Sequence, residues 1–424
     1  MKTHPGVNLT KYLLLIVLLF SCVHIEEKPE QITNSEWAKL QPYVIYISID
    51  GYRADYTDLF RPANILKLRA SGASSESLIP IYPSKTFASH YSMITGLTAD
   101  HTGIVANEFY DPKRKQSFSS GSENAKSDGS WYFGHTLWEV AAAKKMLSAS
   151  YYWVGSEVKI HQTQPTYWFR YDDSVSNSKR VQQVLAWLKL SPEVRPHLIN
   201  LYFSNVDHAG HFSGSVSNEV KSEVLKIDEV IGELMTGVSE LRSSGMPINI
   251  VLVSDHGMDD VKAEVEYIDD EADISAFIVS GHGPEMKLYL KENQERALIL
   301  KTKLALAKSA KHFKIYMRDE IPENLHYRDS ERIGDLVLVV DEPYLVETHS
   351  LFQLKSTRGN HGWDARKYEK MRGIFYAEGP AFKVDTKISS FENYNVYSVI
   401  THLLSLDDLA PVDSSLGERA KIFR

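Results

Sequence analysis

Six acidic and imidazole side chains stand where the hydrophobic pattern of the sequence places the ends of strands or the loops beside them. They are Asp50, Asp207, His211, Asp255, His256 and His361. Carboxylates and imidazoles are common protein ligands of zinc, and a pair of bound ions can activate a hydroxyl and stabilise a leaving oxygen. The set therefore points to a hydrolytic centre with two metal ions, and Thr86 is the hydroxyl that we expect to face them.

Thr86 lies in the segment 83–91, where a proline-limited turn runs into a sequence that can start a helix. At such a start, unpaired N–H groups and the helix dipole favour an anion, or an alkoxide made from the threonine itself. A threonine at this position is most often only a cap, so the segment alone leaves both roles open. His90 follows one turn later, and we expect it to pack or to support a ligand rather than to bind an ion.

The ligand candidates follow apolar runs that read as buried strands. Asp50 ends the run 43–49, which is typical of a central strand in a parallel sheet, and ligands lie outside the carboxyl ends of such strands. In isolation, a turn or capping role for Asp50 is as good an interpretation as metal binding. Asp207 and His211 are four residues apart. On a helical turn their side chains would point the same way and could bind one ion.

Asp255 and His256 follow the run 248–253, and we interpret them as one pair that serves one ion, in preference to a capping role. His361 is flanked by glycines, and we expect it on a flexible loop. Asn107 is a neutral donor that could reach a phosphoryl oxygen, although a lone asparagine is more often an ordinary loop residue. The aromatic cluster at 167–171 is either core or, on a loop past a strand end, a stacking wall.

The elements around these residues predict an α/β fold with a mostly parallel central sheet flanked by helices. Strands are expected at 43–49, 198–203 and 248–253, and a helix at 63–70. Between residues 286 and 340 the order changes to strand, helix, strand, strand, which indicates a small α+β cap inserted at about 275–345. We expect the main domain to extend over residues 41–424.

The chain has 424 residues and a net charge of −8. Because a polyanion would be repelled in general, this charge disfavours a protein that coats nucleic acid. No protein partner is evident from the sequence. Residues 1–22 read as an export signal, and the spacing before Cys22, the only cysteine, resembles the lipobox of a bacterial lipoprotein. The alternative is an ordinary signal peptide. We expect an exported, periplasmic or cell-surface protein with a lipid anchor at Cys22 and a tether over residues 23–40.

Six segments together resemble the nucleotide pyrophosphatase/phosphodiesterase family of the alkaline phosphatase superfamily, in a bacterial lipoprotein-type form. The segments are Asp50-Gly51-Tyr52-Arg53, Pro83 to Tyr91, Asn107, Asp207 with Gly210-His211, Ser254 to Met258, and Gly359 to Gly362. They occur in the family's order from about Tyr43 to the C-terminus. The resemblance implies an alkaline phosphatase-like fold.

The same resemblance implies two zinc ions and assigns their ligands. One ion would be bound by Asp207, His211 and His361, and the other by Asp50, Asp255, His256 and the oxygen of Thr86. Thr86 would attack phosphorus and form a phosphothreonine, while Asn107 and the backbone near Phe87 would stabilise the phosphoryl oxygens. A nucleobase would stack on the aromatic rings of Phe87, Tyr171 and Tyr202, so the substrate would be a small phosphodiester or nucleotide and the product a nucleoside 5′-monophosphate.

Two departures from the family pattern leave the substrate open: Ser204-Asn205-Val206 before Asp207, and Ala88-Ser89 after Phe87. A choline or glycerol phosphodiesterase is one alternative. A phosphomonoesterase or phosphonate hydrolase is another, and it would need a cation such as Lys85 or Arg53 facing the extra phosphate charge. A non-catalytic lipoprotein that binds phosphate or metal is the third.

Overall fold

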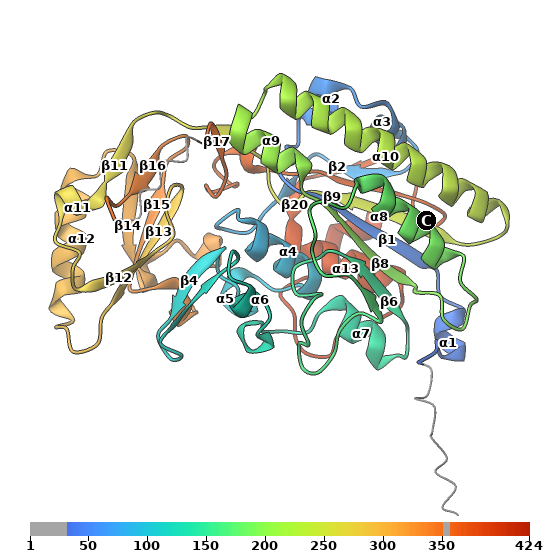
Figure 1. The fold of residues 1–424 in the computed structure, drawn as a ribbon, viewed down its shortest axis with the longest axis horizontal. Coiled ribbons are helices and arrows are strands. Elements are labelled where there is room, and N and C mark those ends of the chain that lie inside the picture. The colour runs from blue at the N-terminus through green and yellow to red at the C-terminus, as the bar shows by residue number, and fades with distance from the viewer. Residues whose placement is uncertain (1–31, 351–356) are drawn as a thin grey trace, which may run out of the picture. The chain divides into compact units, whose positions relative to one another are not determined.

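The computed structural model describes residues 32–350 and 357–424, and the described part is built around an eight-stranded sheet (Figure 1). From one edge to the other, the strands are β19 (Thr386–Ile388), β2 (Ala73–Ser75), β18 (Phe375–Glu378), β9 (Ile248–Val253), β1 (Tyr43–Ile49), β8 (Leu198–Phe203), β6 (Ser148–Tyr151) and β7 (Tyr167–Trp168). Strand β18 runs against its neighbours and the other strands are parallel to one another, which confirms the predicted mostly parallel sheet.

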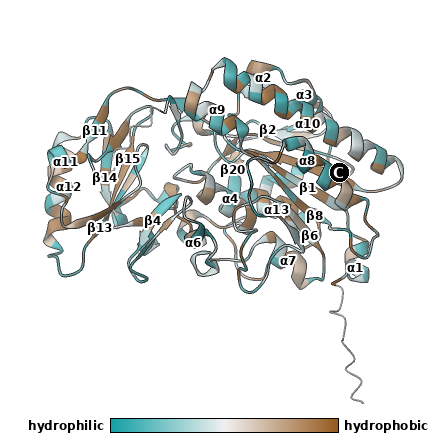
Figure 2. Ribbon diagram, in the orientation of Figure 1, coloured by the Kyte–Doolittle hydropathy of each residue, from teal (hydrophilic) through white to brown (hydrophobic). Residues whose placement is uncertain are grey.

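Strand β1 lies at the centre, with β8 on one side and β9 on the other. Its seven residues are all buried, and the β-branched and aromatic composition suits a strand that is covered on both faces. Alternate side chains enter two separate cores: Val44 and Tyr46 face one, whereas Ile45, Ile47 and Ile49 face the other. Figure 2 shows the hydrophobic residues concentrated along these central strands.

Helices cover both faces of the sheet. The core that contains Val44 is closed by α4 (Thr86–Thr95), α7 (Leu137–Ala143) and α13 (Val396–Leu403). The opposite core is closed by α3 (Ala63–Ala70), α8 (Asn177–Leu188) and the long amphipathic α10 (Asn218–Ser243). Shorter helices are α1 (Glu36–Lys39), α2 (Tyr56–Phe60), α5 (Ala99–Thr102), α6 (Glu123–Lys126) and α9 (Asn205–Ser213).

A second, antiparallel sheet forms the inserted α+β part of the chain. Its order is β12 (Phe277–Ser280), β13 (Glu285–Leu290), β15 (Leu336–Val340) and β14 (Phe313–Met317). The helices α11 (Ile268–Glu271) and α12 (Ala297–Ser309) pack with it around a core of its own (Figure 1). We refer to this part, residues 265–347, as the cap; it is flanked by the two-stranded pair β11 (Val265–Tyr267) and β16 (Leu345–Glu347).

Three further strand pairs border the sheet's carboxyl edge and its flank. They are β3 (Leu78–Ile79) with β20 (Phe391–Glu392), β4 (Glu108–Asp111) with β5 (Gln116–Ser119), and β10 (Asp259–Asp260) with β17 (Gly359–Asn360). The pair β10–β17 is antiparallel and brings the chain back beside β9 after the cap.

The expected signal peptide at 1–22, with the anchor at Cys22, lies outside the described residues. The expected tether at 23–40 differs from the structure over its last residues, because the main domain is packed from Asn34 onward. The Asn34 side chain donates to Pro192 O at 2.9 Å and to Arg195 O at 2.7 Å, and Ala38 is fully buried. Over the described residues, no helix is long and apolar enough to cross a membrane.

Candidate active site

The carboxyl ends of three neighbouring strands converge on one edge of the central sheet. Asp50 directly follows β1, Asp255 lies two residues after β9, and Asp207 is in the first turn of α9, just after β8. Because these strands are adjacent and parallel, their ends open on the same side. The structure thereby brings together carboxylates that are far apart in the sequence.

Thr86 is the first residue of α4 and not its cap. The capping position is Lys85, which has an extended backbone and whose side chain makes no capping hydrogen bond. The hydroxyl of Thr86 instead lies 3.1 Å from His256 Nε2. The capping role that the sequence left open is therefore not the one that the structure shows, and the hydroxyl faces the cluster of acids and imidazoles.

Asp207, His211 and His361 form the first group of ligand atoms. Asp207 and His211 are one turn apart on α9, and Asp207 Oδ1 lies 3.4 Å from His211 Nε2 and 3.6 Å from His361 Nε2. His361 follows β17 and is only 3% exposed. The expectation of a flexible loop for His361 is wrong, because the strand pair β10–β17 and surrounding side chains enclose it.

The second group surrounds His256. Its Nε2 atom lies 3.3 Å from Asp50 Oδ1 and 3.1 Å from Asp255 Oδ2. Asp207 is also within reach, since one ligand atom each from Asp50, Asp207 and His256 lie within 4.8 Å of one another. Asp207 therefore stands between the two groups, a shared position that the sequence did not reveal. The rings of His256 and His361, one from each group, stack with centroids 3.5 Å apart.

All three imidazoles are held in the same tautomer. The Nδ1 atoms of His211, His256 and His361 lie 2.9, 2.8 and 2.7 Å from the carbonyl oxygens of Gly359, Gly257 and Ser84 respectively. A carbonyl can only accept, so Nδ1 carries the proton and the Nε2 lone pair faces the carboxylates. Burial lowers the pKa of all three rings, that of His211 to about 4, which keeps them neutral.

The carboxylate oxygens that face these lone pairs lack a donor. Within the described part of the chain, Asp50 Oδ1, Asp207 Oδ1 and Asp255 Oδ2 are buried without a hydrogen bond. Burial raises the pKa of each acid, to about 8 for Asp50, where the charge of Asp207 adds to the effect, and to about 6 for Asp207. Buried acceptors opposed by lone pairs are costly unless a cation lies between them.

The spacing of these atoms fits zinc. A tetrahedral ion with bonds of roughly 2.0–2.1 Å separates its ligands by roughly 3.3 Å. The five distances given above within the two groups, including that to Thr86, run from 3.1 to 3.6 Å. The donor set, the tautomers and the unpaired oxygens therefore suit two divalent ions.

A supporting set of polar groups holds these ligands, and the sequence identified it only in part. His90 Nδ1 lies 2.9 Å from Thr86 O and 3.3 Å from Asp255 Oδ2, while its Nε2 accepts from the Ser48 hydroxyl at 2.8 Å. Burial lowers the pKa of His90 to about 4, so the ring is a neutral support, as expected. The role of Ser48 was missed, although its place on β1, two residues before Asp50, was the available signal.

Asn107 lies beside the nucleophile turn as predicted, but with its acceptor turned inward. Its Oδ1 atom accepts the Phe87 N–H at 2.9 Å. The Phe87 N–H, which was expected to bind a phosphoryl oxygen, thus donates to the Asn107 side chain instead. The amide NH₂ of Asn107 is the donor that this arrangement leaves pointing away from Phe87.

The three expected base-stacking residues separate into two places. Tyr171 and Tyr202 have ring centroids 6.3 Å apart, whereas Phe87 packs on Phe118 at 6.1 Å. The hydroxyl of Tyr202 also donates to Asp50 Oδ2 at 2.5 Å, which ties this ring to the second ligand group. The neighbouring residues Tyr167 and Trp168 are not in a loop past a strand end, as considered from the sequence, but form the edge strand β7.

Two acids lie beside Tyr171 that the sequence reading did not assign. The Tyr171 hydroxyl donates to Asp173 Oδ1 at 2.8 Å, and the Tyr171 N–H donates to Glu157 Oε1 at 3.0 Å. Asp173 also accepts from Ser204 Oγ at 2.9 Å. The closeness of Asp173 to Tyr171 in sequence was the only signal for this contact.

The two cations considered for an extra phosphate charge are in different situations. Arg53 is bound to both carboxylate oxygens of Asp55, at 2.6 and 2.9 Å. Lys85 donates to His361 O at 2.7 Å, and burial lowers its pKa to about 8. Of these two residues, Lys85 alone borders the ligand groups.

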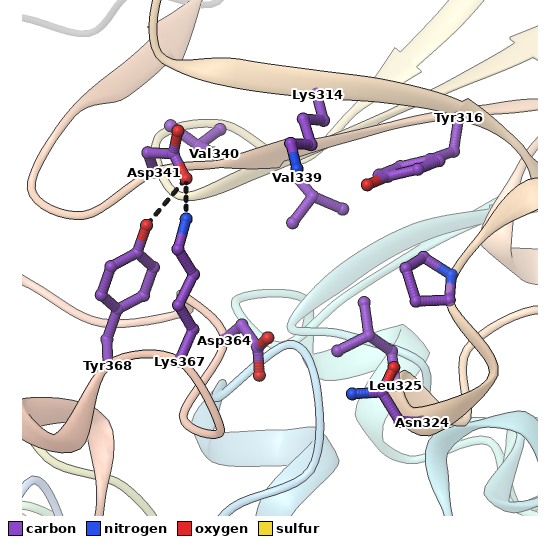
Figure 3. A pocket seen from close by; sticks show the side chains of 11 residues that line it. Lys314, Tyr316, Asn324, Leu325, Val339, Val340, Asp341, Asp364, Lys367 and Tyr368 are labelled. Carbon is purple, nitrogen blue, oxygen red and sulfur yellow. Dashed lines mark hydrogen bonds and ion pairs between the residues drawn. The ribbon is translucent and has the colours of Figure 1, made fainter.

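A separate cavity of about 180 Å³ lies where strands β14 and β15 of the cap meet the loop after His361 (Figure 3). Three of its polar groups are paired with one another: Asp341 Oδ1 accepts from Lys367 Nζ at 2.5 Å and from the Tyr368 hydroxyl at 2.7 Å. None of the predicted ligand or nucleophile residues lines this cavity. The chemistry is therefore located at the sheet edge.

Known proteins resemble this chain in sequence and in fold. Residues 44–364 match the family model for type I phosphodiesterase / nucleotide pyrophosphatase. A venom phosphodiesterase of Naja atra is 35% identical over 86% of this chain and 44% of its own length, and the rat (Rattus norvegicus) ectonucleotide pyrophosphatase/phosphodiesterase family member 3 is 34% identical over 89% and 43%. The chain thus spans less than half the length of these relatives.

Among solved structures, an inactive variant of murine ectonucleotide pyrophosphatase/phosphodiesterase 5, in complex with AMP, superposes with a TM-score of 0.83 at 28% identity. The match covers 91% of this chain and 100% of that one. It confirms the predicted alkaline phosphatase-like α/β fold. The range matched to the family model, 44–364, spans Thr86 and the six ligand candidates, and the chain belongs to the type I phosphodiesterase/nucleotide pyrophosphatase family.

Proposed function

We propose that the protein is a di-zinc hydrolase of phosphodiester and pyrophosphate bonds in nucleotides. The observation that carries the proposal is the row of donorless carboxylate oxygens that faces imidazole lone pairs beside the Thr86 hydroxyl. One zinc would be held by Asp207, His211 and His361, and the other by Asp50, Asp255, His256 and Thr86. When bound, such ions lower the pKa of a hydroxyl and take up charge from a departing oxygen.

Thr86 is placed to be the nucleophile. It begins α4, so the N–H groups of the first turn favour negative charge at its oxygen and at a phosphoryl group beside it. The Thr86 oxygen would bond to phosphorus as the bond to the leaving oxygen breaks, and the threonine proton is lost to solvent as the leaving group gains one. Water would then attack phosphorus and break the bond to Thr86, which releases the monophosphate.

Asn107 and His90 would position this reaction. The amide NH₂ of Asn107 would donate to a phosphoryl oxygen, while its Oδ1 keeps the turn at Phe87 fixed. His90 would hold the Thr86 carbonyl through its Nδ1 proton, and Ser48 would fix the proton on that atom. These contacts keep the hydroxyl and its ligands aligned before the substrate arrives.

A nucleotide is the substrate that the surroundings favour. Aromatic rings border the site at Phe87 and at the pair Tyr171–Tyr202, and stacking a base on such rings is worth roughly 1–3 kcal/mol. The AMP bound by the murine relative supports the same class. We expect release of nucleoside 5′-monophosphates.

A choline phosphodiester is the second candidate, and the acids beside Tyr171 favour it. Asp173 and Glu157 lie against the aromatic pair, and carboxylates beside aromatic rings suit a quaternary ammonium group. Asp173, however, already accepts from Tyr171 and Ser204, which lowers its capacity to face a ligand. We therefore place the nucleotide first.

The test compares four nitrophenyl substrates on one zinc-loaded sample whose metal content is measured. They are a nucleotide diester, bis-nitrophenyl phosphate, nitrophenyl phosphocholine and the plain monoester. The proposal expects the nucleotide diester to be fastest by kcat/KM and the monoester slowest. If the monoester were hydrolysed fastest, the enzyme would be a phosphomonoesterase. If none of the four substrates were hydrolysed at full zinc content, the protein would be a binding protein and not a hydrolase.

We also propose that the chain is exported and anchored through Cys22, on the sequence of residues 1–22 alone. Cys22→Ser should move the protein from the membrane fraction to the soluble exported fraction. The same distribution for both forms would favour an ordinary signal peptide.

A further inference from the structure

We propose a third metal site, outside the active site, formed by His135, Glu139 and His161. The three side chains belong to two segments: His135 and Glu139 flank the start of α7, and His161 lies in the loop that follows β6. One ligand atom from each lies within 4.8 Å of the other two. None of the three residues is among the ligands assigned above.

The distances fit a small divalent ion. Glu139 Oε1 lies 3.3 Å from His135 Nδ1 and 2.9 Å from His161 Nδ1. The ligand separation in a tetrahedral zinc site is roughly 3.3 Å, so the first distance needs no change and the second needs a few tenths of an ångström. Two imidazoles and one carboxylate are a borderline-soft set, which favours Zn²⁺ over Mg²⁺ or Ca²⁺.

Glu139 is the buried residue of the three, and its two carboxylate oxygens have different partners. Oε2 accepts from the Thr136 N–H and hydroxyl, both at 2.8 Å, and so caps α7. Among the described residues, the hydrogen-bond partners of Oε1 are the two histidines. The Glu139 side chain is 4% exposed, and among the described residues no lysine or arginine lies within 4.0 Å of it, so its charge has no permanent cationic partner.

The histidines provide an open side for the ion. The side chains of His135 and His161 are 34% and 49% exposed, so an ion would enter from solvent and keep a water as its fourth ligand. The ring centroids lie 4.9 Å apart and the planes are tilted by 51°, which leaves both Nδ1 atoms directed at Glu139 and not at each other.

His161 is held in place by a tight two-residue turn. Ile160 and Thr163 exchange two backbone hydrogen bonds, and the central residues His161 and Gln162 have φ of 46° and 66°. Such a turn favours asparagine and glycine, and left-handed backbone at other residues costs free energy. An ion bound by His161 would stabilise this unfavourable turn.

The site would fix the loop that supports Tyr171. The same loop carries Glu157, whose Oε1 accepts the Tyr171 N–H. An ion that joins His161 to the start of α7 therefore limits the movement of Glu157. We assign the site a structural role and place no reaction there.

The experiment measures zinc per chain by equilibrium dialysis at micromolar free zinc, for the wild type, Glu139→Gln and His161→Asn. Glutamine can still cap α7, and asparagine tolerates the left-handed turn, so both variants should fold. The control is His101→Asn, which removes a histidine that pairs with a single acid, Asp413, at 2.8 Å. We expect both site variants to bind one equivalent less than the wild type, and the control to match the wild type.

The comparison uses a difference between variants, so it holds whatever number of ions the active site binds. Equal zinc in all four proteins would overturn the proposal, and so would a loss in the control as large as in the site variants. Amide hydrogen exchange provides the second measurement: zinc should slow exchange over residues 157–163 in the wild type and not in His161→Asn. Protection by zinc in both would show that the ion does not bind here.

Discussion

The ligand groups at the sheet edge and the aromatic residues beside them are built in opposite ways. Asp50 and Asp255 are fixed by buried parallel strands, and every imidazole is held by a backbone carbonyl. Tyr171, by contrast, is 37% exposed, and it is held by hydrogen bonds to the side chains of Glu157 and Asp173. On the proposed function, the chemistry thus belongs to the buried core of the fold, whereas substrate choice belongs to its surface.

The sharpest test of the buried centre is Thr86. Thr86→Ala should lower kcat by on the order of 10³-fold or more, because the attacking oxygen is removed, while Thr86→Ser should keep measurable activity. Steady-state rates on a nitrophenyl nucleotide diester check this, with zinc content as the control for an intact site. Equal losses in the two variants would indicate that a water molecule attacks phosphorus instead.

The shared position of Asp207 predicts a graded loss. Asp207→Ala should lower the zinc content at both groups, whereas His211→Ala should affect the first group only, because His211 is not close to the second. Activity should fall by at least about a hundredfold in the first variant, since both ions are needed. If the two variants lost the same amount of zinc, Asp207 would serve one ion alone.

Removal of metal should invert the pH dependence of stability. In the metal-free protein, Asp50 stays protonated up to about pH 8, and Asp255 also has a raised pKa, whereas both ionise near 3.8 when unfolded. The folded state then binds more protons, so stability is lost as pH rises. Above about pH 6.5 the histidines are neutral in both states and no longer oppose this effect.

Between pH 6.5 and 8, the chelated protein should therefore lose up to about 1.4 kcal/mol per pH unit for each of these acids. The zinc-loaded protein should not, because ligands must be deprotonated to bind metal. Thermal unfolding at several pH values, with chelator or with zinc, measures the two slopes. Asp50→Asn should flatten the chelated slope, and slopes of one sign in all samples would contradict the metal assignment.

The aromatic surface should give the smallest effect. Phe87→Ala should raise KM for a nucleotide diester by roughly 5- to 150-fold, which corresponds to a stacking loss of ~1–3 kcal/mol, and should change bis-nitrophenyl phosphate much less. Tyr171→Ala provides the parallel measurement on the other side. Equal effects on both substrates would show that Phe87 supports the nucleophile turn through Phe118 and does not contact a base.

The sequence was sufficient for the ligand groups because strand ends are visible in it. The runs 198–203 and 248–253 are the strands β8 and β9 with the predicted bounds, and parallel pairing then brings Asp207 and Asp255 together. The pattern could not show that Asp207 stands between two groups, because that depends on how α9 is oriented against β1.

The hydrogen-bond partners of individual side chains could not be predicted from the sequence for a similar reason. The contacts of Tyr202 with Asp50 and of Asn107 with Phe87 depend on side-chain rotamers that no spacing rule specifies. The burial of His361 was missed because its flanking glycines suggested freedom. In the structure, Gly359 fits where any side chain would collide with Gly210 O, so the glycine allows close packing instead.

The bond between His361 and Ser84 also determines when the centre is completed. These residues are 277 positions apart, and the whole cap is synthesised between them. A growing chain contains Asp207 and His211 well before His361 emerges, so the first metal group lacks one ligand while the intervening residues are synthesised. On the proposed ligand assignment, metal binding at the first group therefore follows the synthesis of His361 and of the cap before it.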